Sequence, residues 1–76
     1  MANSIFDSEI QPRLNAAAEE LGKRHARGMR VEGFGNEEFL DELISLAGIR
    51  KTAFMRQIIW DNIDMVEVRR HFESAL

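Results

Sequence analysis

The chain lacks cysteine, and it lacks any long apolar run. Without cysteine there can be no disulfide bridge and no thiolate-held metal site. No apolar run approaches the ~20 residues of a membrane-spanning helix. The two histidines, His25 and His71, lie far apart in sequence, whereas a structural zinc site takes about four ligands. We therefore expect no metal, no cofactor and no contact with a membrane.

The sequence also lacks the residue patterns of common active sites. The Gly33-x-Gly35 segment has neither the third glycine nor the Lys-Ser/Thr pair of a phosphate-binding loop. The neighbouring acids Glu37 and Glu38 diverge on a helix, unlike the facing carboxylates that hydrolysis requires. The start, residues 1–7, has no basic region and no long apolar stretch, so it does not resemble a secretory signal. These patterns predict a cytoplasmic protein that is not an enzyme.

Basic residues do not dominate, because the net charge is −3 with 13 acidic and 10 basic residues. A strongly basic balance would have indicated nucleic acid. Electrostatic attraction is local, however, and decays over ~8–10 Å at physiological salt, so converging basic groups could still bind phosphate. Taken singly, each group is better explained as a solvated helix face. The groups are Lys23, Arg24, Arg27 and Arg30; then Arg50, Lys51 and Arg56; then Arg69 and Arg70.

The length of 76 residues indicates a single domain, residues 1–76. Leu14, Ala17, Ala18 and Leu21 recur at helical spacing and predict a helix over residues 11–26. Ser8-x-x-Gln11 fits a capping box that would begin it. Because its apolar face is narrow and rich in alanine, we expect this helix to pack closely against others but to bury little on its own. Ile5 and Phe6 form a candidate hydrophobic anchor before it.

Three further helices are predicted after residue 36. Asn36 is a good N-cap for a helix over residues 37–47, and Gly48 fits the left-handed position that ends it. Asp64-x-x-Glu67 offers a capping box for the last helix, although Ile63-Asp64 reads equally as a break or a bend. Between them lies a helix over residues 51–62. Its wide apolar band predicts the best-buried surface of the chain, from Phe54, Met55, Ile58, Ile59, Trp60 and Ile63.

Residues 29–35 are the only stretch with strand character. Met29, Val31 and Gly33 would share one face of a strand, with Arg30 and Glu32 on the other. The two glycines weaken this reading, so an irregular loop is equally consistent with the sequence. The predicted fold class is therefore a small, mainly α-helical domain with one short possible β-strand.

The segment Gly48-Ile49-x-Lys51-Thr52-x-Phe54-Met55-Arg56-x-x-Ile59 resembles the turn and second helix of the ribbon-helix-helix family, the Arc/MetJ/CopG-type DNA-binding dimers. The resemblance covers about residues 29–63. It leaves residues 1–28 as an N-terminal helical extension and residues 64–76 as a C-terminal helix. Arg50 stands where that family usually has serine.

The resemblance implies a homodimer that binds double-stranded DNA. A strand from each chain would enter the major groove, with Arg30, Glu32 and Phe34 facing the bases. The start of the second helix would point its free amides at a phosphate, and Lys51 and Thr52 would contact it. The resulting DNA-binding set is Arg30, Arg50, Lys51, Thr52 and Arg56. The implied functions are a transcriptional repressor, an antitoxin or a plasmid or phage accessory factor.

Two other interpretations fit the same sequence. A helix-turn-helix over Leu40 to Ile58 would also bind DNA, although Ile44 and Gln57 suit its packing poorly. Alternatively, the chain is an all-helical protein-protein interaction module, an inhibitor or adaptor with no nucleic-acid role. Its protein partner would then dock on the first helix, or on the face of the last helix that carries Met65, Val68 and Phe72.

Overall fold

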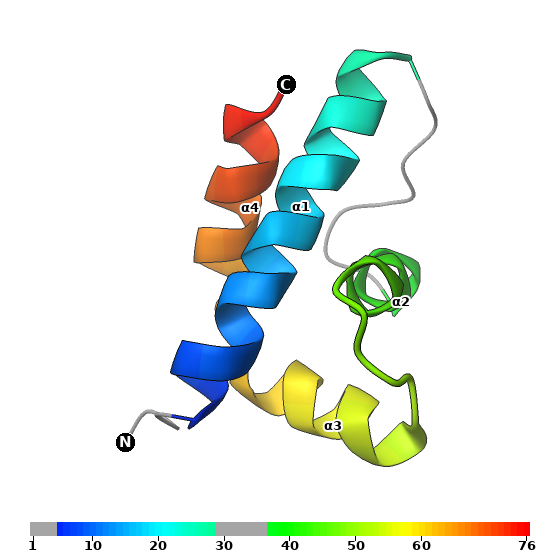
Figure 1. Cartoon of the computed structure of the whole chain (residues 1–76), viewed down its shortest axis with the longest axis vertical. Helices are drawn as coiled ribbons and strands as arrows, with labels where there is room; N and C mark the ends of the chain where they lie inside the picture. The colour runs from blue at the N-terminus through cyan, green and yellow to red at the C-terminus, as the bar shows by residue number, and fades with distance from the viewer. Residues whose placement is uncertain (1–4, 29–36) are drawn as a thin grey trace.

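Helix α1 lies at the centre of the fold (Figure 1). The computed structural model describes residues 5–28 and 37–76. A π-helical turn, η1 (Phe6–Ile10), runs directly into α1 (Gln11–Ala26), and α2 (Glu37–Leu46), α3 (Ala53–Asn62) and α4 (Met65–Ser74) follow. Helix α4 runs beside α1 for most of its length, α2 packs on another side of α1, and α3 lies near the start of α1. The described part of the chain is thus mainly helical, as predicted, and contains no strand.

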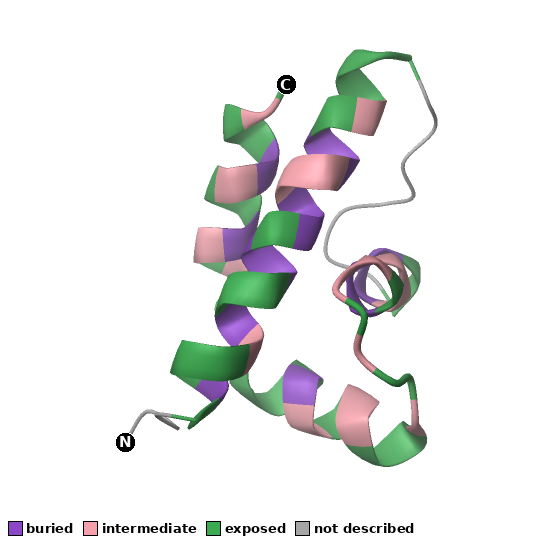
Figure 2. Cartoon of the chain, viewed as in Figure 1, coloured by how far each residue is buried: buried purple, intermediate pink, exposed green. Residues whose placement is uncertain are grey.

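The central position of α1 overturns the expectation that this helix buries little. Leu14, Ala17, Ala18 and Leu21 are all buried, and Figure 2 shows buried positions along α1 up to Gly22, before its exposed last turn. The small alanine side chains let neighbouring helices approach closely, as the sequence predicted. One core cluster joins it to the buried side chains of every other element: Phe6, Phe39, Leu40, Leu43, Ile44, Ile59, Val68 and Phe72.

Helices α1 and α4 approach each other closely at Gly22. A Cβ atom on Gly22 would collide with the carbonyl oxygen of Phe72 and would lie 2.9 Å from the Cβ of Ala75. Glycine is therefore required here by the close passage of two backbones, and not by an unusual backbone angle.

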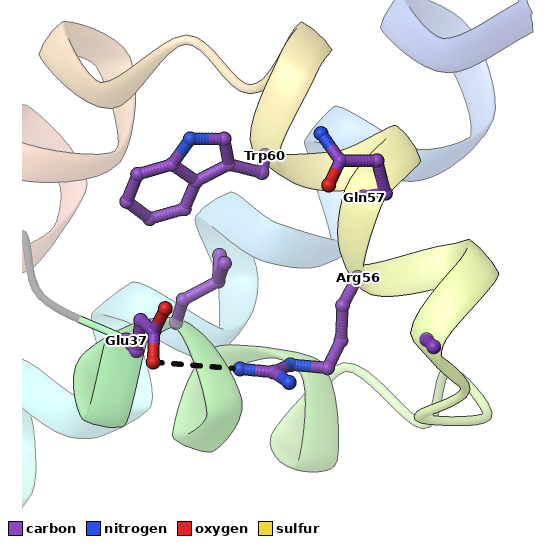
Figure 3. Close-up of a pocket in the computed structure, with 6 residues that line it drawn as sticks. Glu37, Arg56, Gln57 and Trp60 are labelled. Atoms are coloured by element: carbon purple, nitrogen blue, oxygen red, sulfur yellow. Dashed lines mark ion pairs between the residues drawn. The ribbon is translucent and has the colours of Figure 1, made fainter.

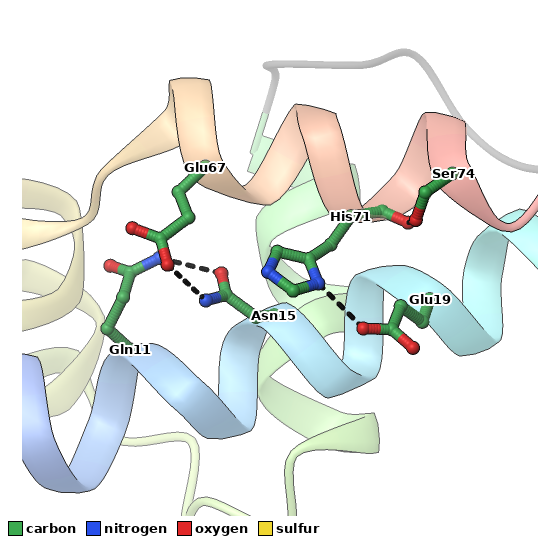
Figure 4. A network of polar contacts seen from close by, with 6 residues as sticks. All are labelled: Gln11, Asn15, Glu19, Glu67, His71 and Ser74. Carbon is green, nitrogen blue, oxygen red and sulfur yellow. Dashed lines mark hydrogen bonds and ion pairs between the residues drawn. The ribbon is translucent and has the colours of Figure 1, made fainter.

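Polar side chains also join α1 to the start of α4 (Figure 4). The buried Gln11 amide donates to the carbonyl of Asp64 at 3.3 Å and accepts from the Asp64 N–H at 2.9 Å. It also donates to Asn15 at 2.9 Å, and Asn15 donates to Glu67 at 2.9 Å. One step further along, His71 Nδ1 lies 2.6 Å from Glu19. Because these partners advance together along both helices, α1 and α4 run in the same direction.

The predicted bounds of the first helix, residues 11–26, match α1, but the predicted capping box at Ser8 is wrong. The chain is already helical at Ile5, with φ −67° and ψ −45°, so Ser8 lies inside a helical segment. Its hydroxyl donates to the Ile5 carbonyl at 3.4 Å and does not cap α1. Of the two anchor residues predicted here, Phe6 is buried as expected, whereas Ile5 is exposed.

The later helix boundaries follow the local sequence signals. Gly48 has φ +73°, which confirms the left-handed position after α2. The Asp64 carboxylate accepts from the Glu67 N–H at 3.1 Å and caps α4. Ile63 is extended, with φ −62° and ψ 135°, so α3 and α4 are separated by a true break. The candidate strand at residues 29–34 and the proposed cap Asn36 lie outside the described residues.

None of the described helices has the length and apolar character needed to cross a bilayer.

Candidate functional site

Helix α3 carries two large aromatic side chains into solvent. The sequence predicted that its apolar band would be the best-buried surface of the chain, and this prediction was wrong. Only Ile59 is buried, whereas Phe54 is 74% exposed and Trp60 is 54% exposed. An α-helix turns by about 100° per residue, so a band this wide cannot all face one core. Ile59 faces the core, which places Phe54 and Trp60 on the flanks of the solvent side.

The exposed side of α3 forms a continuous surface with a polar centre. In the middle, Gln57 Nε2 donates to the Asp61 carboxylate at 2.8 Å. Phe54 lies on one side of this pair and Trp60 on the other. We call this the α3 surface and define it by five of the six exposed residues of α3, leaving out Asn62 at its end: Ala53, Phe54, Gln57, Trp60 and Asp61.

A groove of about 300 Å³ borders the α3 surface on its Trp60 side. Glu37 and Leu40 of α2 form one wall, and α3 forms the other with Ala53, Arg56, Gln57 and Trp60. Figure 3 shows the Trp60 ring on α3 and the Glu37 carboxylate on α2 at opposite walls of the groove, with Arg56 reaching from α3 toward Glu37. The α3 surface thus combines an aromatic ring, a cavity and an exposed carboxylate.

Arg56 joins α3 to α2. Its Nε lies 3.0 Å from Asp41 Oδ1, and its Nη2 lies 4.0 Å from Glu37 Oε2. The Nε and Oδ1 atoms are shielded from water, yet their alignment does not make a hydrogen bond, so the contact is an attraction between charges. The resemblance placed Arg56 in the DNA-binding set; in the structure its guanidinium lies against two carboxylates.

The turn before α3 collects three of the predicted DNA-contacting residues. Arg50 and Lys51 are exposed, and neither has an ion-pair partner within residues 5–28 and 37–76. The Thr52 hydroxyl accepts from the Met55 N–H at 3.1 Å, so it takes the N-cap role that Arg50 cannot fill. The fifth predicted residue, Arg30, lies outside the described residues.

A second groove brings two of the basic groups together with acids. It measures about 330 Å³ and lies between α1, α2 and the turn. Arg24 and Lys51 line it together with Asp41 and Glu42. Arg24 also pairs with Glu20 at 3.3 Å. Basic side chains from two of the sequence groups therefore do meet in this groove, but carboxylates beside them offset their charge.

The two docking faces proposed from the sequence, on α1 and α4, contribute to the core of the fold. Val68 and Phe72 of α4 are buried in the core, as is the apolar face of α1. The outward position of Phe54 and Trp60 was missed. The available signal was the width of the α3 band, which exceeds what one side of a helix can bury.

Within the described ranges, no three histidine, aspartate or glutamate side chains gather as a metal site. Comparison of the chain with protein-family models, curated proteins and solved structures finds no match. The resemblance to the ribbon-helix-helix family stays a prediction.

Proposed function

We propose that this protein is a helical interaction module that binds a protein partner through the α3 surface and its groove. The observation that carries the proposal is the joint exposure of Phe54 and Trp60 on one short helix. Aromatic side chains are enriched at protein interfaces relative to the rest of a protein surface.

The composition of the α3 surface suits a protein interface. Aromatic side chains are the usual anchors of interfaces, and covering Phe54 and Trp60 would contribute about 1–2 kcal/mol each from apolar burial. The Gln57–Asp61 pair and the exposed Glu37 supply polar contacts at and around the centre. A ten-residue helix is also marginal in water, so α3 gains stability from a partner that covers it.

Site-specific photo-cross-linking tests this proposal. A photoreactive phenylalanine analogue replaces Phe54 in the full chain, and the matched control carries it at Val66, an apolar position on α4 that is 80% exposed. We expect protein adducts from position 54, and we expect the Trp60→Ala change to remove them. Adducts that form equally from position 66, or that survive Trp60→Ala, would contradict the proposal.

Binding of double-stranded DNA is a second candidate, and a separate observation favours it. Arg50 and Lys51 are exposed at the start of α3, where the helix dipole also attracts anions. In a titration into duplex DNA at ~50 mM salt, the Arg50→Ala/Lys51→Ala variant should weaken binding and reduce the salt slope by about two. Arg13→Ala/Arg70→Ala removes the same charge from other exposed positions and should have a smaller effect. Absence of binding by the unaltered chain would eliminate this candidate.

A further inference from the structure

We propose that the partner of the α3 surface is a second copy of this chain, which packs its own α3 against the first in antiparallel orientation. This inference rests on the proposed function and names the partner. It also gives a structural form to the homodimer that the sequence led us to expect.

The first argument comes from how little of α3 the chain itself covers. Of its five large apolar side chains only Ile59 is buried, whereas Met55 and Ile58 are half-buried and Phe54 and Trp60 are exposed. Chains of this size commonly need oligomerisation to complete a marginal core. A second copy provides a surface of the same character, because each chain carries the same unpaired aromatics.

The second argument comes from the charges at the two ends of α3. Arg50 and Lys51 precede the helix, and Asp61 and Asp64 lie at its other end; all four are exposed. Ten residues at 1.5 Å each make α3 about 15 Å long, so both ends can take part in one contact. In an antiparallel pair the basic end of each helix meets the acidic end of the other, and the helix dipoles also oppose. A parallel pair would place like charges together.

The third argument is the symmetry of the surface. Gln57 lies midway in sequence between Phe54 and Trp60 and occupies the middle of the exposed side. A two-fold axis that passes between the two Gln57 residues places each flank of one α3 next to the same flank of the other α3. The two Phe54 side chains then share one side of the contact, and the two Trp60 side chains share the other. Such a contact is isologous and closes at two copies.

Sedimentation equilibrium of the full chain tests the inference. We expect the unaltered protein to approach twice its 8.7 kDa monomer mass as concentration rises. The Kd of the Phe54→Ala/Trp60→Ala variant should rise at least about tenfold. The variant removes both aromatic side chains from each of the two copies, and a tenfold change in Kd corresponds to only a small part of the apolar burial that is lost. Val66→Ala, which shortens an exposed apolar side chain on α4, should leave association unchanged. Circular dichroism and urea midpoints show whether each variant stays folded.

A charge-reversal pair tests the antiparallel orientation. Arg50→Glu/Lys51→Glu places acids against Asp61 of the second copy, and Asp61→Lys places a base against its basic turn. Each variant alone should associate several-fold more weakly at low salt. An equal mixture should recover association, because both ends of a mixed dimer then carry opposite charges. A mixture no tighter than the separate variants would overturn the antiparallel arrangement.

Other outcomes overturn the inference while leaving the proposed function standing. A monomer of 8.7 kDa at about 1 mM, the range of the weakest specific contacts, would exclude the second copy as partner. A dimer that is unaffected by Phe54→Ala/Trp60→Ala would place the contact elsewhere. If the chain is monomeric but position 54 still cross-links to a different protein, the α3 surface is an interface and its occupant is not a second copy.

Discussion

Replacing Gln11 with leucine should destabilise the contact between α1 and the start of α4. The side chain is 5% exposed, and its amide makes three hydrogen bonds, two of them to the backbone of Asp64. Leucine has a similar size but neither donates nor accepts. The variant therefore leaves the Asp64 N–H and the Asn15 side-chain oxygen without their partner.

The size of the effect follows from those orphaned groups. A buried polar group that loses its partner costs about 1–3 kcal/mol, and part of this is recovered because leucine buries more apolar surface than glutamine. We expect a net loss of about 1–2 kcal/mol from the free energy of unfolding. For a chain of this length, each kcal/mol lowers the Tm by about 4–8 °C.

Urea unfolding followed by circular dichroism measures the loss. With a slope of about 1 kcal/mol/M, the midpoint should fall by about 1–2 M. Gln57→Leu is the matched control, because the exposed Gln57 amide makes a single hydrogen bond within the described residues, to Asp61, and its loss leaves no buried group unpaired. An unchanged midpoint for Gln11→Leu, or an equal drop for both variants, would refute the view that the hydrogen bonds of Gln11 hold α1 and α4 together.

Three further changes test separate parts of the structure. Gly22→Val should lower the free energy of unfolding by about 1–3 kcal/mol, because the added side chain forces α1 away from α4. The control Ala16→Val, on the exposed side of α1, should cost less than about 1 kcal/mol. Equal melting temperatures for the two variants would contradict the close approach of the helices. Thr52→Ala should cost about 0.5–2 kcal/mol and speed hydrogen exchange in the first turn of α3, and Thr52→Ser should restore both. Asp41→Asn should cost no more than about 1 kcal/mol: although the two contacting atoms are shielded, the Asp41 and Arg56 side chains are 33% and 39% exposed, so solvent screens the pair. A larger drop in Tm would show that this ion pair stabilises the fold more than a solvent-screened pair does.

Local sequence signals predicted the helix positions well. Helical spacing predicted the observed bounds of α1 and predicted those of α2 to within one residue, and the glycine at 48 marked the end of α2. The aspartate at 64 marked the start of α4 in the same way. These features depend on hydrogen bonds between residues three or four apart, so the sequence contains both partners side by side.

The sequence did not predict which helix would be central. A narrow alanine face and a wide aromatic band suggest the wrong order of burial, because burial depends on which other helices arrive. The Gln11–Asp64 clamp joins residues 53 positions apart, and nothing in the local pattern of either residue indicates the other. The same holds for Arg56, whose acidic neighbours on α2 are found only after the helices pack.

The emission of Trp60, the only tryptophan of the chain, tests the account most directly. In the single chain its ring is half-exposed, and an exposed indole emits at longer wavelength than one covered by protein. If the α3 surface binds a second copy, emission should shift to shorter wavelength with rising protein concentration, and Phe54→Ala should push that shift to higher concentration. An emission maximum that stays at the exposed position up to about 1 mM, the weakest affinity of a specific contact, would contradict the account.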